Sequence, residues 1–247
     1  MGSKNGRGGV RSIAKRQHFH MNFILRNFAL NGWLWVVDKK TGRGREATTI
    51  DDCFVAKEIW SNEIEEMVGN QGIERRAQGQ IRRVINGEAI SDHQAISEYD
   101  IFWKLRHKFR REVLPPYKIM EGWSDRKHPE HDKITEWCNV NGKVYVRGDG
   151  TISGKDSLSQ QIKSSIDINI AQYEKGVWVP HYHPGGNFIS ADCYQLPIMP
   201  ISPYYVLVCT QRGKAEKGIV IEDDDEVEVF NNEAKKQCHE FWFYAKS

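Results

Sequence analysis

Basic and aromatic side chains are interleaved between positions 103 and 111, a combination that suits phosphate binding. Five Lys and Arg residues fall within positions 104–111. At helical spacing, Arg106 and Arg110 share a face with Trp103, while the other basic side chains point elsewhere. Guanidinium groups beside aromatic rings favour contacts with phosphate and stacked bases; a solvated helix face is the alternative. The candidate residues for binding nucleic acid or phosphate are Arg106, Lys108, Arg110 and Arg111.

A His-x-His motif at His181 and His183 offers a second kind of chemistry. In a strand, side chains at i and i+2 point to the same face, so both imidazoles could bind one metal ion. The Pro-Gly-Gly turn that follows resembles the first metal motif of the cupins, but the next acidic residue is Asp192 and no second motif follows. We expect a half-exposed hairpin whose histidines are solvated or capped by the backbone, and a cupin-like metal enzyme is an alternative.

His18 and His20 form another His-x-His motif, directly before an apolar helical pattern. Two basic residues precede the pair, so it can simply continue the cationic N-terminal segment. A buried, hydrogen-bonded His18 at the start of the helix would need no catalytic role.

The acidic run from Glu222 to Glu226, followed by Glu228, is the strongest local concentration of charge. It lacks the alternating ligands and central Gly of an EF-hand loop, so we expect a solvated surface loop unless a cation or a helix N-terminus meets it. The sequence also contains no GxSxG, P-loop or GxGxxG motif, which excludes the usual serine-hydrolase and nucleotide-binding signatures.

Charge and composition describe a globular chain rather than a dedicated nucleic-acid binder. The 247 residues include 35 basic and 33 acidic ones, for a formal charge of +2. Five basic and no acidic residues lie in positions 1–16, which leaves 30 of the 35 basic residues against all 33 acidic ones in the rest. We therefore expect a flexible basic arm at 1–16 attached to a slightly negative body.

The five cysteines are odd in number and contain no CxxC pair, which argues against a disulfide framework and a zinc finger. No apolar run is long enough to span a bilayer, and no secretory h-region follows the basic N-terminus. We expect a cytoplasmic protein without a membrane partner; the sequence leaves the oligomeric state open.

Hydrophobic periodicity predicts an α+β fold in which residues 17–247 form a single domain. A helical middle segment at about 61–115, interrupted at Gly69–Gly72, packs on a mixed or antiparallel sheet built from N-terminal and C-terminal strands. The other expected helices cover 19–28, 158–173 and 231–239. The expected strands are 33–37 with a hairpin partner, 143–147, 177–179, 187–190, 204–210, 218–221 and 241–244.

Taken in order, several segments resemble an uncharacterised family of bacterial and phage proteins, a domain of unknown function. The matching segments are Gln17-His18 to Phe28 ("HxxPxxxLrnF"), Leu34 to Gly42, Ile73-Glu74 with Ala77, Leu105-Arg106 to Arg110, Phe188 to Asp192 ("FitSDnP"), Pro200 to Pro203 ("PLSP") and Asn231-Asn232 onward. The chain departs from the pattern at Phe23, near the usual proline, and at Cys193 and Tyr194.

The resemblance implies no activity, because none is established for that family, but it nominates polar positions. These are His18, Glu74, Arg106 or Arg110, Asp192 and Asn231. Two carboxylates can hold a divalent ion, a histidine can move a proton, and an arginine can offset developing charge.

The resulting hypothesis is a metal-assisted phosphodiesterase or nuclease-like enzyme acting on nucleic acid or nucleotide, in phage–host conflict within the bacterial cytosol. Glu74 and Asp192 would bind Mg²⁺ or Mn²⁺, with Zn²⁺ less favoured, His18 would be the acid or base, and Arg106 would be the further catalytic residue. The rival is a non-catalytic inhibitor or nucleic-acid-binding adaptor whose partner is a host or phage protein. The enzyme hypothesis requires these side chains to converge in one cleft.

Overall fold

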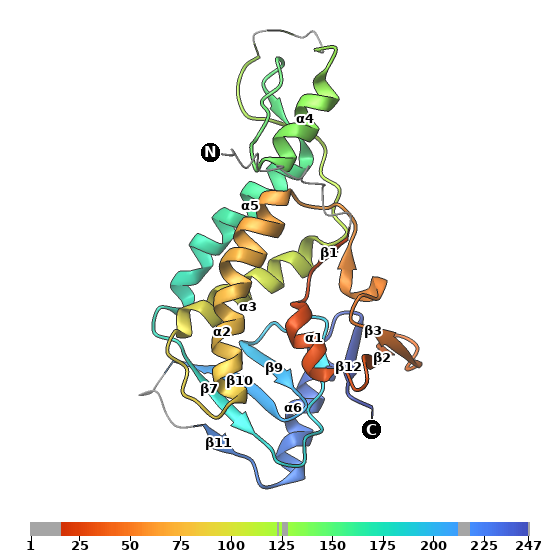
Figure 1. Ribbon diagram of the computed structural model, residues 1–247, viewed down its shortest axis with the longest axis vertical. Helices are drawn as coiled ribbons and strands as arrows, with labels where there is room; N and C mark the ends of the chain where they lie inside the picture. The colour runs from red at the N-terminus through yellow and green to blue at the C-terminus, as the bar shows by residue number, and fades with distance from the viewer. Residues whose placement is uncertain (1–15, 123, 125–127, 212–217, 247) are drawn as a thin grey trace, which may run out of the picture.

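The computed structural model describes residues 16–122, 124, 128–211 and 218–246, and its fold is α+β as predicted (Figure 1). All of the predicted basic arm except Arg16 lies outside these residues. The helical elements are α1 (Asn22–Phe28), η1 (Asp52–Phe54), η2 (Glu63–Ile73), α2 (Glu74–Ile85), α3 (His93–Phe109), α4 (His131–Val140), α5 (Gly154–Ile170), η3 (Ala171–Tyr173) and α6 (Asp224–Gln237).

Two four-stranded sheets form the β part of the fold. The first has the order β11-β7-β10-β9 and the second the order β3-β2-β12-β8. Their strands are β2 (Trp33–Asp38), β3 (Gly44–Thr48), β7 (Val177–Tyr182), β8 (Ser190–Ala191), β9 (Ile198–Ser202), β10 (Tyr205–Thr210), β11 (Ile219–Val220) and β12 (Phe241–Tyr244). Two short pairs complete the set: β1 (Gln17–His18) with β4 (Val55–Ala56), and β5 (Tyr117–Lys118) with β6 (Thr151–Ile152).

The second sheet joins the two ends of the chain. β12 pairs antiparallel with β2, with Trp242 opposite Val37, and on its other side with β8. This confirms the prediction that N-terminal and C-terminal strands share a sheet. Side chains alternate between faces along β12, so Phe241 and Phe243 are buried while Trp242 and Tyr244 stay partly exposed.

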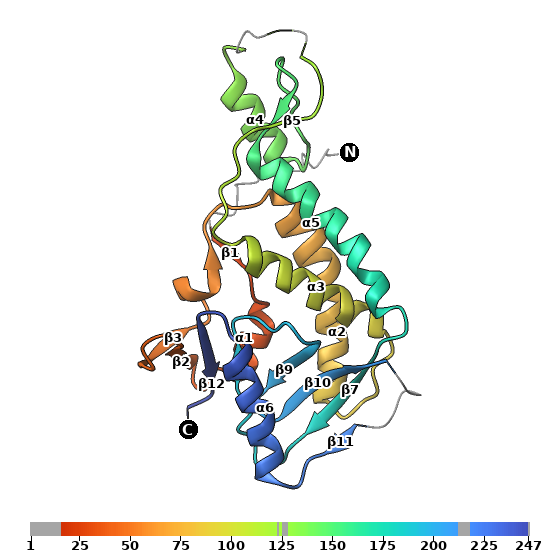
Figure 2. The same ribbon diagram turned by 180° about the vertical axis from the view of Figure 1, so that it is seen from behind.

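Helix α3 packs against both α2 and α5, and the three helices lie together in Figure 2. It is anchored to β7, because the indole of Trp178 donates to Ser97 Oγ at 2.8 Å and the Trp178 amide donates to His93 Nδ1 at 3.1 Å. Buried residues occur all around α3, including Tyr99, Phe102 and Trp103. Its basic stretch is therefore only partly a surface feature.

The predicted interruption at Gly69–Gly72 is wrong. η2 is a π-helical segment that runs through these glycines directly into α2. Helices in proteins are stabilised mainly by packing of their apolar faces, so a glycine pair can be tolerated where neighbouring turns are anchored. Ile64 and Ile73, at the two ends of η2, are both buried in the core.

The predicted strand at 143–147 is also wrong, and β9 was not predicted. Residues 143–147 pair with no strand in the described part of the chain, and the amide of Arg147 instead donates to Thr151 O in a turn. β9 contains Pro200, and a proline argues against a strand because it has no N–H to donate. The structure places β9 at the edge of its sheet, where a missing N–H is tolerated.

The acidic run is the N-terminus of α6 rather than a loop. Asp223 caps the helix by accepting from the Asp225 amide, and three acidic residues occupy its first turn. Carboxylates are favoured there because they satisfy free amides and offset the helix dipole. The last helix therefore begins at Asp224 and not at Asn231. Asn231 lies inside the helix, where its Oδ1 accepts from the amide of Ile189 and its Nδ2 donates to Asn187 O, at 2.9 Å each.

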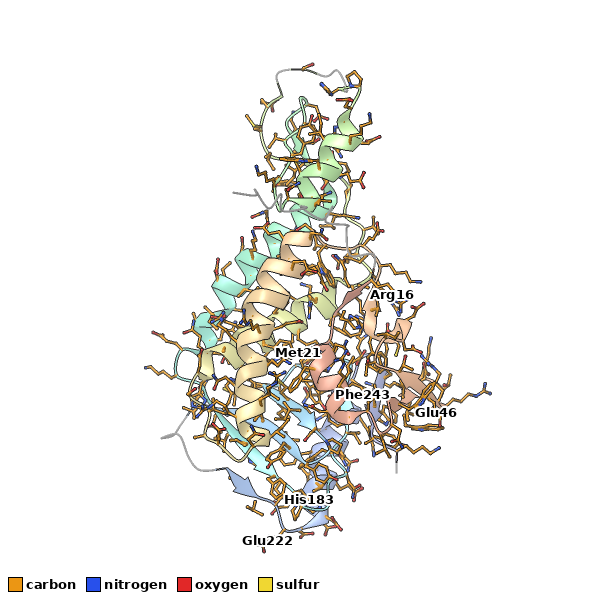
Figure 3. The ribbon with its side chains drawn as sticks, viewed as in Figure 1. Arg16, Met21, Glu46, His183, Glu222 and Phe243 are labelled. Carbon is orange, nitrogen blue, oxygen red and sulfur yellow. The ribbon has the colours of Figure 1, made fainter. Side chains whose placement is uncertain are left out.

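His20 packs as an aromatic ring in the core. Figure 3 labels Met21, the next residue along the chain, and Phe243, which the ring of His20 contacts. Its ring lies 4.6 Å from that of Trp103 and 5.5 Å from that of Phe243, centroid to centroid. Neither ring nitrogen has a hydrogen-bond partner among the described residues. Burial lowers the pKa of His20 to about 3, so the ring is neutral at physiological pH.

We expect His20→Phe to make the protein less sensitive to acid. In the unfolded chain His20 takes up a proton near pH 6.5, whereas the folded state resists it, so the wild type loses stability as pH falls below 6.5. Between pH 8 and pH 5 this loss is about 2 kcal/mol of unfolding free energy, and the variant should lack it. Urea unfolding at both pH values measures the difference; an equal acid loss in both proteins contradicts the assignment.

Candidate metal centre and arginine groove

The carboxylate of Asp192 is fully buried just after β8 and is held by groups from two other elements. Oδ1 accepts from the amide of His239 at 2.8 Å, and Oδ2 accepts from the amide of Glu240 at 2.9 Å. The Asp192 amide donates to Phe241 O at 3.0 Å. The turn between α6 and β12 is therefore fastened to the end of β8.

His107, on the last turn of α3, completes this arrangement. Its Nε2 lies 3.0 Å from Asp192 Oδ2, and its Nδ1 lies 3.3 Å from Nη1 of Arg110. A guanidinium only donates, so Nδ1 is the acceptor and, in the neutral ring, Nε2 carries the proton donated to Asp192. Burial lowers the pKa of His107, and Asp192 opposes that effect.

His239 brings a third possible ligand atom to the same place. One ligand atom each from His107, Asp192 and His239 lie within 4.8 Å of one another, the one such group of three among the described residues. The side chain of His239 is 69% exposed, whereas those of the other two are buried. Two imidazoles and one carboxylate suit Zn²⁺ or Mn²⁺, with open positions on the solvent side.

An open groove of about 390 Å³ lies next to this group. Arg110 connects the two: it lines the groove, and its Nη2 is 4.0 Å from Asp192 and 2.9 Å from Glu240. Arg111 also lines the groove and pairs with Glu240 at 2.7 Å. Arg43 also lines the groove and forms no ion pair with the described residues. The groove thus offers guanidinium groups to an anion that displaces Glu240.

A second buried charge cluster lies between η2, α2 and α3. Arg106 is completely buried and pairs with Glu74 and, at 3.7 Å, with Glu65. Glu65 also accepts from the indole of Trp60 at 2.7 Å. Burial raises the pKa of Glu65 to about 7, with Arg106 opposing the rise. Because one cation faces two carboxyls, protonation of Glu65 leaves the cluster electrically neutral.

The structure divides the polar residues nominated from the sequence between these two clusters. Glu74 and Arg106 are partners of each other, and Asp192 belongs with His107, so Glu74 and Asp192 are not partners in the group of three. His18 is half-buried on the side of the second cluster, whose Arg106 and Glu74 act on its charge. Its Nε2 lies 3.3 Å from Thr49 O, and burial lowers its pKa.

The expected phosphate-binding residues are divided in the same way. Arg106 has no exposed side chain and cannot touch a substrate. Arg110 and Arg111 line the groove. Lys108 is exposed and lies over the ring of Phe109 at 5.1 Å, outside the groove lining.

His181 and His183 face α6 and are engaged locally. His183 has Nδ1 3.0 Å from Ile221 O and Nε2 3.1 Å from Asp224, near Glu222 at the lower end of the molecule in Figure 3. His181 has Nδ1 3.2 Å from Val179 O, and its ring packs against Phe230. Neither histidine belongs to a three-ligand group among the described residues.

Sequence reasoning missed His107 and His239. His107 lies within the basic run 104–111. The one signal in the sequence that sets it apart is its spacing of one helical turn from Arg110. His239 was the end of an expected helix. Their convergence with Asp192 depends on the pairing of β8 with β12 and on where α3 ends.

We expect Glu65→Gln to remove a loss of stability at neutral pH. The pKa of Glu65 is raised from 4.5 to about 7 on folding, so the folded state holds the proton more tightly and the wild type loses stability as pH rises through this range. The loss is about 3 kcal/mol of unfolding free energy. Chemical unfolding at pH 5 and pH 8 measures it, with the exposed neighbour Glu66→Gln as control; parallel behaviour of all three proteins contradicts the prediction.

Comparison with known proteins gives no relative from which to transfer a role. No family model, no curated protein and no solved structure matches the chain. The resemblance to the bacterial and phage family therefore stays a prediction from the order of motifs. Among the described helices, none combines the length and apolar character that crossing a bilayer requires.

Proposed function

We propose that this chain is a metal-assisted phosphodiesterase, nuclease-like in its chemistry, that acts on nucleic acid or nucleotide. The observation that supports the proposal is the meeting of a possible His-Asp-His ligand group with a groove lined by Arg110 and Arg111. Phosphodiester hydrolysis needs a group that activates water and cations that stabilise charge on the phosphate.

The donor set favours Mn²⁺ or Zn²⁺ over Mg²⁺. Magnesium prefers oxygen ligands and retains its waters, whereas imidazole nitrogen suits the transition metals. The three side chains would hold the ion, which would polarise a phosphoryl oxygen and lower the pKa of a bound water. To hold an ion through Nε2, the neutral ring of His107 would carry its proton on Nδ1 instead, and its contact with Arg110 would open. Protonation of His107 would remove the lone pair that binds the ion, so metal binding should weaken at acid pH.

Glu240 gives the groove a second chemical role. Its carboxylate pairs with both Arg110 and Arg111, and one of its oxygens lies 3.8 Å from His239 Nδ1. A phosphate group entering the groove would take over the guanidinium contacts. The released carboxylate would then be placed beside His239 to accept a proton from the attacking water.

The satisfied hydrogen bonding of Asp192 favours a non-catalytic protein as the second candidate. Its two oxygens already receive three hydrogen bonds, from His107, His239 and Glu240. Such a network can serve only to fasten α3 to the second sheet. The basic residues would then bind a partner through a surface that needs no metal.

We expect His239→Ala to reduce metal affinity at least tenfold without unfolding the protein, because this side chain is largely exposed. Calorimetric titration of the metal-free chain with Mn²⁺ and Zn²⁺ measures binding, and hydrolysis of bis(p-nitrophenyl) phosphate with and without chelator measures activity. The exposed His128→Ala serves as control. Absence of metal binding, or hydrolysis that survives the chelator, would remove the metal from the mechanism.

We expect Arg111→Gln to raise KM for a phosphodiester roughly tenfold, the effect of losing one charge-assisted hydrogen bond to phosphate. kcat should change less, because Arg110 remains next to the metal group. Steady-state kinetics with a short oligonucleotide separates the two parameters. Lys118→Gln, an exposed charge on β5, is the control; an unchanged KM for the Arg111 variant would exclude the groove as the substrate site.

A further inference from the structure

A second cavity, of about 730 Å³, lies where the pairing of β8 with β12 ends. β8 pairs with β12 at Trp242 and Phe243, and among the described residues no strand pairs with this edge of β12 at Tyr244. The end of α1, the segment 185–189 and α6 close the other sides, and these elements lie together in Figure 2.

This cavity and the arginine groove lie on opposite faces of the second sheet. Val36 and Phe241 line the arginine groove, whereas Val37 and Trp242 line the cavity. Neighbouring residues of one strand point to opposite faces. The cavity is therefore a separate site and not an extension of the proposed active site.

Five of the sixteen residues that line the cavity are aromatic. Trp242 and Tyr244 come from the outward face of β12, and Tyr204 stands across from them at 48% exposure. Gly186, with φ of +73°, lets the Tyr204 ring pack on the backbone, since a Cβ there would lie 3.1 Å from the ring. Fixed indole and phenol faces favour a flat, bicyclic ligand, and the volume is typical of small-molecule sites.

The polar groups of the cavity add a positive charge and an acceptor. Lys235 of α6 lines the cavity and forms no ion pair with the described residues, whereas its neighbour Lys236 pairs with Glu233 at 3.7 Å. Asn27 donates from Nδ2 to Ile201 O at 2.9 Å, which fixes its amide. Its Oδ1 receives no hydrogen bond from the described residues and can accept from an amino group.

We propose that this cavity binds a purine nucleoside 5′-monophosphate, whose base would stack among the aromatic rings and whose phosphate would pair with Lys235. A purine supplies the bicyclic π-face, its exocyclic amino or ring N–H group suits Asn27, and the phosphate matches the unpaired ammonium. The proposal does not rest on the metal-assisted activity, because the residues of the two sites lie on different faces of the sheet.

Calorimetry on the full chain, with AMP and GMP as ligands and adenosine as the uncharged analogue, tests this site. We expect saturable 1:1 binding of at least one monophosphate and at least tenfold weaker binding of adenosine. Lys235→Gln should weaken the monophosphate about tenfold, and Tyr204→Ala should weaken both ligands. Lys236→Gln, the exposed neighbour on the same helix, should bind as the wild type does.

Two further arms separate this site from the proposed active site and identify the source of the nucleotide. The wild type with chelator and the His239→Ala variant should both still bind the monophosphate, even if neither hydrolyses a phosphodiester. A 5′-phosphorylated single-stranded oligonucleotide distinguishes a nucleic-acid end from free nucleotide. No binding of either monophosphate, unchanged affinity in Lys235→Gln, or loss of binding in His239→Ala would overturn the proposal.

Discussion

The buried carboxylate of Asp192 is the interaction on which the arrangement of the molecule depends. It joins the end of α3 to the turn between α6 and β12 through His107, His239 and Glu240. A carboxylate without exposed surface is tolerated only when its oxygens are hydrogen-bonded, and here they receive two amides and a ring nitrogen. The same contacts that make the carboxylate tolerable hold the possible metal ligands together, so structural stability and candidate chemistry share one group.

The molecule handles its second buried charge differently. Arg106 is surrounded by Glu65 and Glu74, with the ring of Phe102 4.3 Å from its guanidinium carbon. Breaking a buried pair by removing one partner is strongly destabilising because the remaining charge is left uncompensated. Arg106 thus ties η2 and α2 to α3 and is a structural cation. Arg110, one turn further along, is also largely buried, but it lines the groove and pairs with Glu240.

The sequence predicted those elements whose local pattern agrees with their tertiary surroundings. The α+β class, α5, β10 and the shared sheet of β2 and β12 follow from periodicity and β-branched or aromatic content. Predictions failed where long-range packing overrode local preference. Val144 and its neighbours alternate like a strand but have no pairing partner, whereas β9 forms despite Pro200 because it lies at a sheet edge.

By itself the sequence determined the residue types available for chemistry, the separation of charge along the chain and the fold class. Only the tertiary structure decided which of these residues meet. Helical spacing predicted that Arg106 and Arg110 share one helix face. It could not predict that Arg106 is completely buried whereas Arg110 lines a groove. Spacing likewise could not predict that Asp192 contacts His107 and His239. These contacts join residues 85 and 47 positions apart in the sequence, and they arise from sheet pairing and helix packing. Local periodicity carries no information about such distances, since it records only neighbours along one element.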